Sequence, residues 1–207
     1  TVGDGDLANV SMSKTDDTHW YYGWTIPSGS DDDETFIVRI WAKDNASNYL
    51  NPYPTTDASK SIDNTAPVCT IAYNRSATYF KTGDLIKLYA NFTETPSGMN
   101  PTTVMISIST PGNGDLANTS MSQTNNLHWY YTWTIPAGSD DDGPMTVKIW
   151  AKDNASNPLS TYPTTDSSKT IDNTAPSVSS AVLQSPNGKE AWSNTHSILW
   201  ADDDITD

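Results

Sequence analysis

The sequence His19-Trp20-Tyr21-Tyr22-Gly23-Trp24-Thr25-Ile26-Pro27 returns almost unchanged as His128-Trp129-Tyr130-Tyr131-Thr132-Trp133-Thr134-Ile135-Pro136. The two copies stand 109 positions apart (128 − 19). When residues 1–66 are aligned with residues 110–175 without a gap, the two segments are identical at 47 of 66 positions. A chain that repeats itself this closely is usually built from modules arranged in series. The repeat therefore predicts modules of about a hundred residues rather than one large domain.

Within each copy, apolar residues recur at every second position, which is the period of a half-buried β-strand. One predicted strand begins at the His-Trp pair and ends at the proline, and it places four tryptophans in the core: Trp20, Trp24, Trp129 and Trp133. A second predicted strand has these inward positions in the two copies: Phe36, Val38, Ile40 and Ala42, then Met145, Val147, Ile149 and Ala151. Since the outward positions accept charge, the register of this strand is well specified.

Residues 67–175 are expected to form one complete module. Strands are predicted at Val68 to Tyr73, at Leu85 to Phe92, and around Val104 to Ile108, each with alternate residues facing inward. Together with the repeated half, this gives roughly seven short strands separated by Gly, Pro, Asn and Asp turns, with no useful helical period. The pattern predicts an all-β fold, an antiparallel β-sandwich.

The repeat also divides the chain into three expected units. Residues 1–66 correspond to the C-terminal part of a module whose start is missing, and residues 67–175 are the complete module. Residues 176–207 are expected to be the N-terminal part of a further module of a different subtype. Strands are predicted there at Val178 to Gln184 and Ser197 to Ala201, with a turn at residues 185–190.

Composition and charge exclude several classes of partner. The net charge is −14, and no Lys/Arg stripe exists, so nucleic acid and anionic membranes are poor partners. No apolar run approaches the length of a membrane span. The single cysteine, Cys69, excludes an intramolecular disulfide and is expected to be a small buried residue. Few lysines and many Thr, Ser, Asn and Asp residues suggest a secreted or cell-surface protein.

Two recurring motifs resemble the end of a bacterial Ig-like domain. These are Ala151-Lys152-Asp153-Asn154-Ala155-Ser156-Asn157 and Ile171-Asp172-Asn173-Thr174-Ala175-Pro176. They are similar to the Asp-x-Ala-Gly-Asn turn and the Asp-x-Thr-Ala-Pro junction of that family, and Phe92-Thr93-Glu94 resembles its Phe-Ser-Glu. Residues 185–188 with Trp192 and Trp200 resemble a related Ig-like module of large bacterial and archaeal surface proteins.

The resemblance implies tandem immunoglobulin-like modules in an extended array, as in the stalks and adhesins of cell surfaces, often with Ca²⁺ at the junctions. This sequence departs from the family where Ser47 and Ser156 replace the turn glycine, and the change creates Asn-x-Ser sequons. The chain's sequons are candidate N-glycosylation sites, although some arise by chance in so Asn- and Ser-rich a chain: Asn9, Asn45, Asn74, Asn91, Asn118 and Asn154.

Clustered Asp and Asn residues at the module junctions make Ca²⁺ the strongest chemical candidate. Calcium takes six to eight hard oxygen ligands, which carboxylates and carbonyls supply. Asp44 and Asp153 begin turns that should lie at the same end as the junctions, and Glu94 could approach from the next module. The candidate ligands are Asp44, Asp63, Asn64, Glu94, Asp153, Asp172 and Asn173. The alternative is that these residues only form side-chain turns near a proline.

Other features give weaker hypotheses. The Asp triplets at residues 31–33, 140–142 and 202–204 are expected to be solvated loop tips. Trp41 and Trp150 fall on outward positions and could stack on sugar rings, although neighbouring basic side chains could equally cover them. No histidine pair has metal-ligand spacing, and no glycine-rich phosphate loop follows a strand, so we expect no enzyme.

The sequence therefore predicts a non-catalytic structural or adhesive segment of an extracellular surface protein, forming a stiff stalk, fibre or filament. Carbohydrate-binding accessory modules of a secreted hydrolase are the alternative. Expected partners are neighbouring modules or copies of the same protein, and glycans or other surface polymers. One copy's residues 176–207 could complete another copy's residues 1–66 by strand complementation, although this supplies no equivalent of the strand around Met105 to Ser109.

Overall fold

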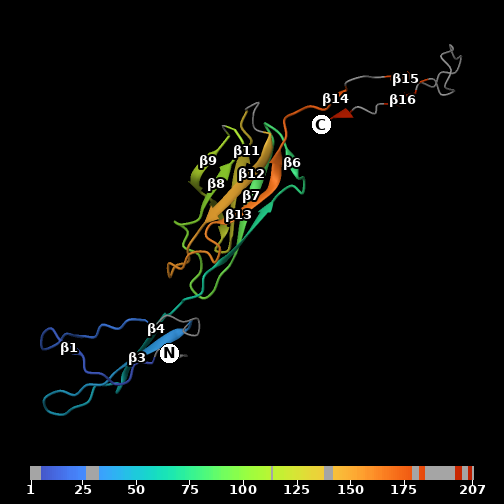
Figure 1. Ribbon diagram of the computed structural model, residues 1–207. Helices are drawn as coiled ribbons and strands as arrows, with labels where there is room; N and C mark the ends of the chain where they lie inside the picture. Colours follow the sequence, from blue (N-terminus) through green and yellow to red (C-terminus); the bar gives the residue numbers. More distant parts are fainter. Residues whose placement is uncertain are drawn as a thin grey trace.

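A computed structural model describes residues 6–26, 33–112, 114–137, 142–178, 182–184, 199–201 and 205–206, with side chains as far as residue 177. All regular structure in these residues is β-strand (Figure 1). The predicted all-β class is therefore confirmed. No helix in this part of the chain is long and apolar enough to cross a membrane.

Residues 67–175 fold into two sheets. The four-stranded sheet has the order β10 (Ser122–Asn125), β11 (His128–Thr134), β7 (Leu85–Thr93) and β5 (Val68–Tyr73). The five-stranded sheet has the order β6 (Tyr79–Phe80), β13 (Thr164–Ile171), β12 (Gly143–Trp150), β8 (Met105–Ser109) and β9 (Leu116–Ser120). All pairings are antiparallel except that of β6 with β13, which is parallel.

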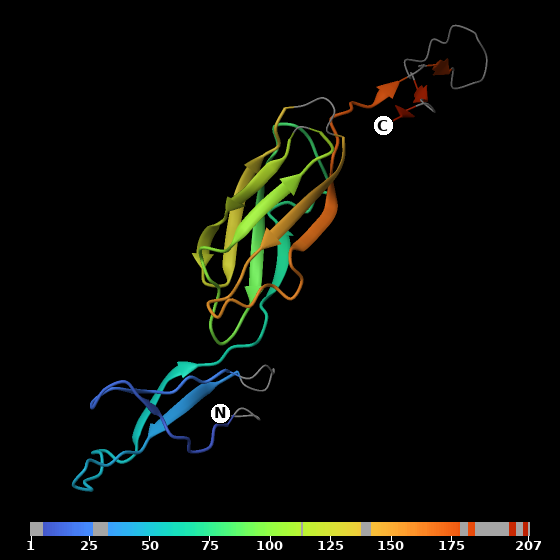
Figure 2. The same cartoon turned by 60° about the vertical axis from the view of Figure 1, so that its left-hand side comes forward.

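The two sheets enclose one hydrophobic core, as a β-sandwich does (Figure 2). The predicted inward residues of β7, β8 and β12 all lie in it, and Ile86, Val104 and Val147 are completely buried. Trp129 and Trp133 are also buried, as expected. Alternation with a period of two thus identified the core correctly, because each of these strands has only one apolar face.

The described residues of the sandwich form nine strands, β5 to β13, where roughly seven were predicted. The short strands β6, β9 and β10 were missed. β6 has two residues, and β10 is entirely polar, so neither carries an alternating pattern long enough to recognise. β9 pairs with β8 across an irregular register, and most of its residues are exposed.

The first repeat forms two separate hairpins, β1 (Ser13–Lys14) with β2 (Trp20–Tyr21) and β3 (Thr35–Ile40) with β4 (Thr55–Ser61). Here the predicted core is wrong, because Trp20 is 54% exposed, and Val38, Ile40 and Ala42 are exposed as well. Trp24 is half-buried beside Phe36, with ring centroids 5.7 Å apart. In the sandwich, β5, β7 and β8 cover the equivalent face, and no strand of the described residues 6–26 and 33–66 does so.

The described residues after 176 form four short strands. They are β14 (Ser177–Val178), which pairs with β17 (Ile205–Thr206), and β15 (Val182–Gln184), which pairs with β16 (Leu199–Ala201). Strands thus occur in both stretches where they were predicted. The predicted turn at residues 185–190 and the side chains of Trp192 and Trp200 lie outside the described residues.

Candidate functional site: an acidic cluster where the first repeat meets the sandwich

Residues 62–67, which connect the first repeat to the sandwich, are hydrogen-bonded to the end of the sandwich. The Asn157 side-chain amide donates to the backbone carbonyl of Asp63 at 2.9 Å, and the Ser160 N–H donates to the carbonyl of Pro67 at 2.9 Å. The Ser97 N–H donates to the Asp63 carboxylate at 3.2 Å. Ile62 and Pro67 are buried on either side. These bonds hold the connection, which we call the seam, against the end of the sandwich. Figure 2 shows its backbone running from the first repeat into the sandwich.

Three carboxylates from distant parts of the sequence meet at this seam. Asp63 ends the first repeat, Glu94 follows β7, and Asp153 begins the turn after β12. One oxygen of each lies within 4.8 Å of the others, and their exposed fractions are 8%, 6% and 0%. No lysine, arginine or histidine of the described residues forms an ion pair with any of them. The cluster therefore concentrates negative charge in a buried place without a basic partner.

The turn at residues 153–157 fixes the Asp153 carboxylate. Both of its oxygens accept hydrogen bonds from Asn157, one from the backbone N–H and one from the side-chain amide, each at 2.8 Å. Ser156 closes the turn with a φ of 78°, in the left-handed region that favours glycine. The first repeat builds the same turn at Asp44, with Ser47 at a φ of 71°.

Glu94 is the least satisfied member of the cluster. Its Oε2 atom is buried and has no hydrogen-bond partner in the described part of the chain, while Oε1 accepts a long bond of 3.4 Å from the Ser97 hydroxyl. Burial, followed by the charges of Asp63 and Asp153, raises the pKa of Glu94 to about 7. A buried carboxylate oxygen without a partner is costly unless a cation or a donor satisfies it.

The loop at residues 95–98 holds Glu94 and Ser97 in place. Gly98 has a φ of +76°, and a Cβ there would lie 2.4 Å from the side-chain nitrogen of Asn126. The Gly98 carbonyl accepts a hydrogen bond from the backbone N–H of Asn154 at 2.9 Å. The side-chain amide of Asn154 donates to the Ser97 carbonyl at 2.9 Å. The two loops that carry Glu94 and Asp153 are thus bonded directly to each other.

These residues fit a hard divalent cation. Three carboxylates provide up to six oxygens, and each oxygen has two lone pairs, so an oxygen that accepts one N–H can still coordinate a metal. Asp63 and Asp153 are oriented by N–H donors, and the unpartnered Glu94 oxygen lies in the same cluster. A bound cation would also neutralise the mutual repulsion of the three charges.

The other candidate ligands lie elsewhere. Asp44 is exposed, and its carboxylate accepts bonds from Ala46 and Asn48. The Asn64 N–H donates to Asp33, the Asn173 side-chain oxygen accepts the Thr82 N–H at 2.7 Å, and the Asp172 carboxylate accepts the Thr174 N–H at 3.0 Å. Within the described residues, neither Asp44 nor Asp172 belongs to a cluster of three metal-ligating groups.

The last aspartate of two Asp triplets has a structural role that the sequence did not reveal. Asp33 accepts bonds from the Asn64 N–H and the Thr65 hydroxyl, and Asp142 accepts the equivalent bonds from Asn173 and Thr174. These bonds lower the pKa of Asp142. Asp142 is exposed, as predicted for a solvated residue, and Asp33 is half-buried. Neither is only a loop tip, because each accepts hydrogen bonds from the residues of a junction. Residues 31–32, 140–141 and 202–204 lie outside the described residues.

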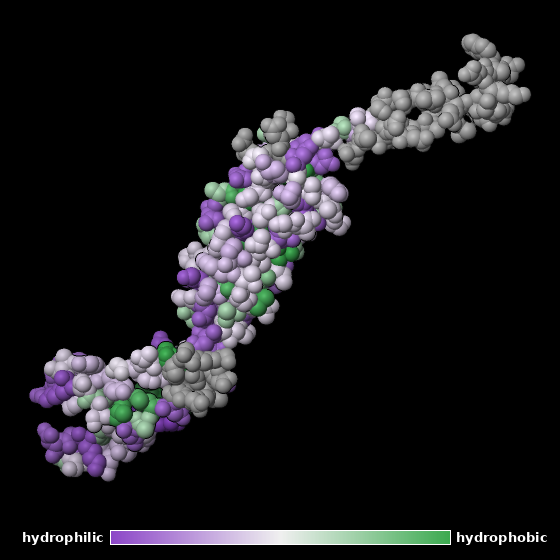
Figure 3. All heavy atoms as spheres, viewed as in Figure 1, coloured by the Kyte–Doolittle hydropathy of each residue, from purple (hydrophilic) through white to green (hydrophobic). Residues whose placement is uncertain are grey.

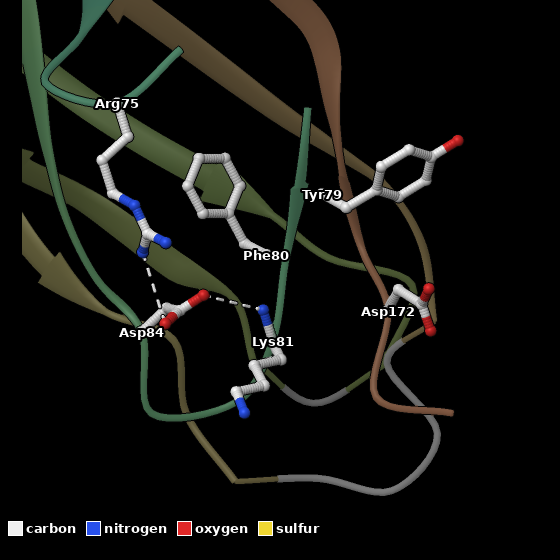
Figure 4. A pocket seen from close by; sticks show the side chains of 6 residues that line it. All are labelled: Arg75, Tyr79, Phe80, Lys81, Asp84 and Asp172. Carbon is white, nitrogen blue, oxygen red and sulfur yellow. Dashed lines mark hydrogen bonds and ion pairs between the residues drawn. The ribbon is translucent and has the colours of Figure 1, made fainter. Parts of the chain in front are cut away.

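A second surface feature is the hollow lined by Arg75, Tyr79, Phe80, Lys81, Asp84 and Asp172 (Figure 4). Two of its charged side chains pair with each other. Arg75 pairs with Asp84 at 3.3 Å and lies over the Phe80 ring, and the Lys81 N–H donates to the other oxygen of Asp84. The charges of Arg75 and Asp84 therefore neutralise each other.

The outward tryptophans differ between the two repeats. Trp41 is 45% exposed, whereas Trp150 is half-buried on β12. The cation–π contacts of Lys43 and Lys87 involve the tyrosine rings of Tyr49 and Tyr130 and not these tryptophans.

Five of the six candidate N-glycosylation sites are exposed: Asn9, Asn45, Asn74, Asn118 and Asn154. The sixth, Asn91, is half-buried within β7. Cys69 is buried as expected, and burial raises the pKa of its thiol to about 12.

A scan against models of known protein families finds no match, and no curated protein is similar to this chain.

Proposed function

We propose that this chain is a non-catalytic structural segment of an extracellular surface protein, built from immunoglobulin-like modules in series. In this proposal the acidic cluster, formed by Asp63, Glu94 and Asp153, binds Ca²⁺ and fixes one module against the next. The array then acts as a stiff stalk or fibre that holds other parts of the protein away from the cell.

The strand order of the sandwich supports an immunoglobulin-like module. In such folds one sheet carries strands A, B, E and D, and the other carries G, F and C, with C′ beside C in the larger types. Assigning β5 as A, β7 as B, β11 as E and β10 as D reproduces the first sheet. The order β13, β12, β8, β9 reproduces the second, and β6 adds a short parallel strand at its edge.

The observation that carries the proposal is that Asp63 belongs to one repeat while Glu94 and Asp153 belong to the next module. A cation held by all three would cross-link the two, and bending at the seam would break its ligand set. The chemistry that the cation supplies is charge neutralisation and coordination, which replaces repulsion between buried carboxylates with attraction. The hydrogen bonds of Asn157 and Ser97 already hold the seam close to that arrangement.

Thermal unfolding of the full chain in Ca²⁺ and in EDTA tests the proposal. A ligand that binds only the folded state raises the melting temperature as its concentration rises above Kd. We expect Ca²⁺ to raise the melting temperature of the wild type and of Asp44→Asn, but not that of Asp153→Asn. Asp44 is a matched control because it occupies the same turn in the first repeat, 109 positions earlier, and is exposed.

Equal melting of the wild type in both buffers would remove calcium from the proposal. A gain of the same size in Asp153→Asn would place any bound ion away from the seam.

A further inference from the structure

The chain enters the sandwich at one end and leaves it at the other. It enters through β5, which begins at Val68 beside the seam, and it leaves through β13, which ends at Ile171. Figure 2 shows the entry and the exit at opposite ends of the sandwich, and Figure 3 shows the sandwich as an elongated body between them. Tension along a series of such modules therefore pulls β5 and β13 in opposite directions, along the length of the sandwich.

The strand that follows β5 lies directly beside the strand through which the chain leaves. β6 pairs with β13 in parallel, with Tyr79 opposite Thr170 and Phe80 opposite Ile171. β6 lies at the edge of the five-stranded sheet, so among the described strands it pairs with β13 alone. The entering part of the chain is thus bonded directly to the leaving part.

We call the hydrogen bonds between residues 77–82 and residues 169–173 the parallel ladder. Two of these bonds join backbone groups, and two use a side chain of the leaving strand or of the residues after it. They are Lys169 Nζ to the Ala77 carbonyl (2.9 Å), the Thr170 N–H to the Thr78 carbonyl (3.0 Å), the Asp172 N–H to the Phe80 carbonyl (2.8 Å) and the Thr82 N–H to Asn173 Oδ1 (2.7 Å). The ladder is therefore longer than the two residues of β6.

Both sides of the parallel ladder are anchored in the core. Phe80 is 2% exposed, and Ile171 is completely buried. Figure 4 shows the Phe80 and Tyr79 side chains leaving β6 on opposite sides, with the Arg75 guanidinium beside the Phe80 ring. Arg75 also pairs with Asp84, which follows β6. β6 therefore cannot slide along β13 without pulling Phe80 out of the core.

The direction of the load decides how the ladder breaks. Bonds in a parallel pair are evenly spaced along the strands, so tension along the strands loads them together. Tension across the strands would open them one at a time. Bonds that must break together present a larger barrier, although each contributes only about 1 kcal/mol to equilibrium stability. Resistance to pulling is governed by the rate of unfolding, and hence by this barrier.

We propose that the parallel ladder is the load-bearing element of the module, and that it keeps the sandwich folded under tension. Detaching β5 alone leaves β6 bonded to β13, so the two ends of the sandwich stay connected until the ladder breaks. The core is still intact at that point, because the ladder lies at the edge of the five-stranded sheet. This inference deepens the proposed role as a stalk and rests on it, but the acidic cluster takes no part in it.

Single-molecule pulling on the two ends of the full chain, in buffer free of Ca²⁺, tests the proposal independently of the acidic cluster. The sandwich has 109 residues (175 − 66), so its unfolding lengthens the chain by roughly 300–350 Å, which identifies the event. Tyr79→His with Thr170→His places two imidazoles on a register pair of the ladder, where Ni²⁺ can bridge them. We expect Ni²⁺ to slow the unfolding of this variant at constant force about tenfold or more.

Ser107→His with Lys148→His is the matched control. These residues are also a register pair, but they join β12 to β8 away from the ladder. A higher melting temperature in Ni²⁺ establishes that each pair binds the ion. We expect Ni²⁺ to leave the unfolding of the control under force unchanged, which also excludes an effect of Ni²⁺ at the acidic cluster. Equal slowing of both variants, or binding of Ni²⁺ to the ladder pair without slowing, would overturn the proposal.

Removing bonds from the ladder gives the opposite result. Lys169→Met with Asn173→Ala removes its two side-chain bonds, and we expect unfolding at constant force to become about fivefold faster or more. Val147→Ala weakens the core, which is still intact when the ladder breaks, so it should change this rate by less than about twofold. A larger acceleration by Val147→Ala than by the ladder variant would show that the core bears the load.

Discussion

At the scale of single residues, the seam contains a carboxylate, Glu94, whose ionised form is destabilised by its surroundings. Glu94 is buried beside two other acids, and one of its oxygens has no hydrogen-bond partner in the described part of the chain. Without a cation, protonation is the way to relieve this arrangement. The same residue can therefore make the seam sensitive to pH in EDTA and insensitive to it in Ca²⁺.

The pKa of Glu94 gives the sign of this pH dependence. Since its pKa is about 7 in the folded chain and 4.5 for an ordinary glutamate, the folded state binds more protons between these values. The free energy of unfolding in EDTA should therefore fall as pH rises from about 4.5 to about 7, by on the order of 1–3 kcal/mol. Chemical denaturation at several pH values measures this.

Glu94→Gln provides the control for the pH experiment. The amide cannot ionise, so its stability profile should be flatter than that of the wild type across the same range. A wild-type profile that rises with pH in EDTA would contradict the assignment of a raised pKa to Glu94.

At the scale of strands, the repeat places one sequence in two environments. β12 and β3 have the same alternation, but only β12 has a partner sheet across its apolar face. Valine at equivalent positions is consequently buried in one copy and exposed in the other. Burial here depends on the neighbouring strands and not on the local pattern.

Substituting the two equivalent valines measures this difference. Val147→Ala should lower the free energy of unfolding by about 1–3 kcal/mol, because it removes buried methyl groups and leaves a cavity. Val38→Ala should change it by less than about 0.5 kcal/mol, as most exposed substitutions do. Denaturant unfolding of the two variants gives both values, and equal losses would contradict the account of the first repeat.

The strands also show how far the sequence could predict the structure. The inward residues of β7, β8 and β12 were predictable because a period of two is local information. The exposure of Trp20 was not, since it depends on which strands lie opposite. The position of Asp63, Glu94 and Asp153 in the recurring motifs was enough to predict them as candidate metal ligands. The hydrogen bonds that Asp33 and Asp142 accept at the junctions were not predictable, because they depend on how two loops approach each other. A long-range hydrogen bond of this kind leaves no periodic signal.

At the scale of the whole molecule, the first repeat and the sandwich are joined by residues 62–67 with little free chain between them. Ala66 precedes a proline and is biased to an extended conformation, and Pro67 has a fixed φ. Hydrogen bonds from Asn157, Ser97 and Ser160 hold this short connection against the sandwich. The central claim is that a cation at the acidic cluster makes this connection rigid.

The most direct test is the distribution of distances between spin labels placed across the seam. Labels at Ala58→Cys in β4 and Ala117→Cys in β9 occupy exposed positions on opposite sides of it, and the buried Cys69 thiol should not react. Pulsed electron resonance should give a broader distribution in EDTA than in Ca²⁺, and Asp153→Asn should remain broad in both. A wild-type distribution of the same width with and without Ca²⁺ would contradict a calcium-stiffened seam.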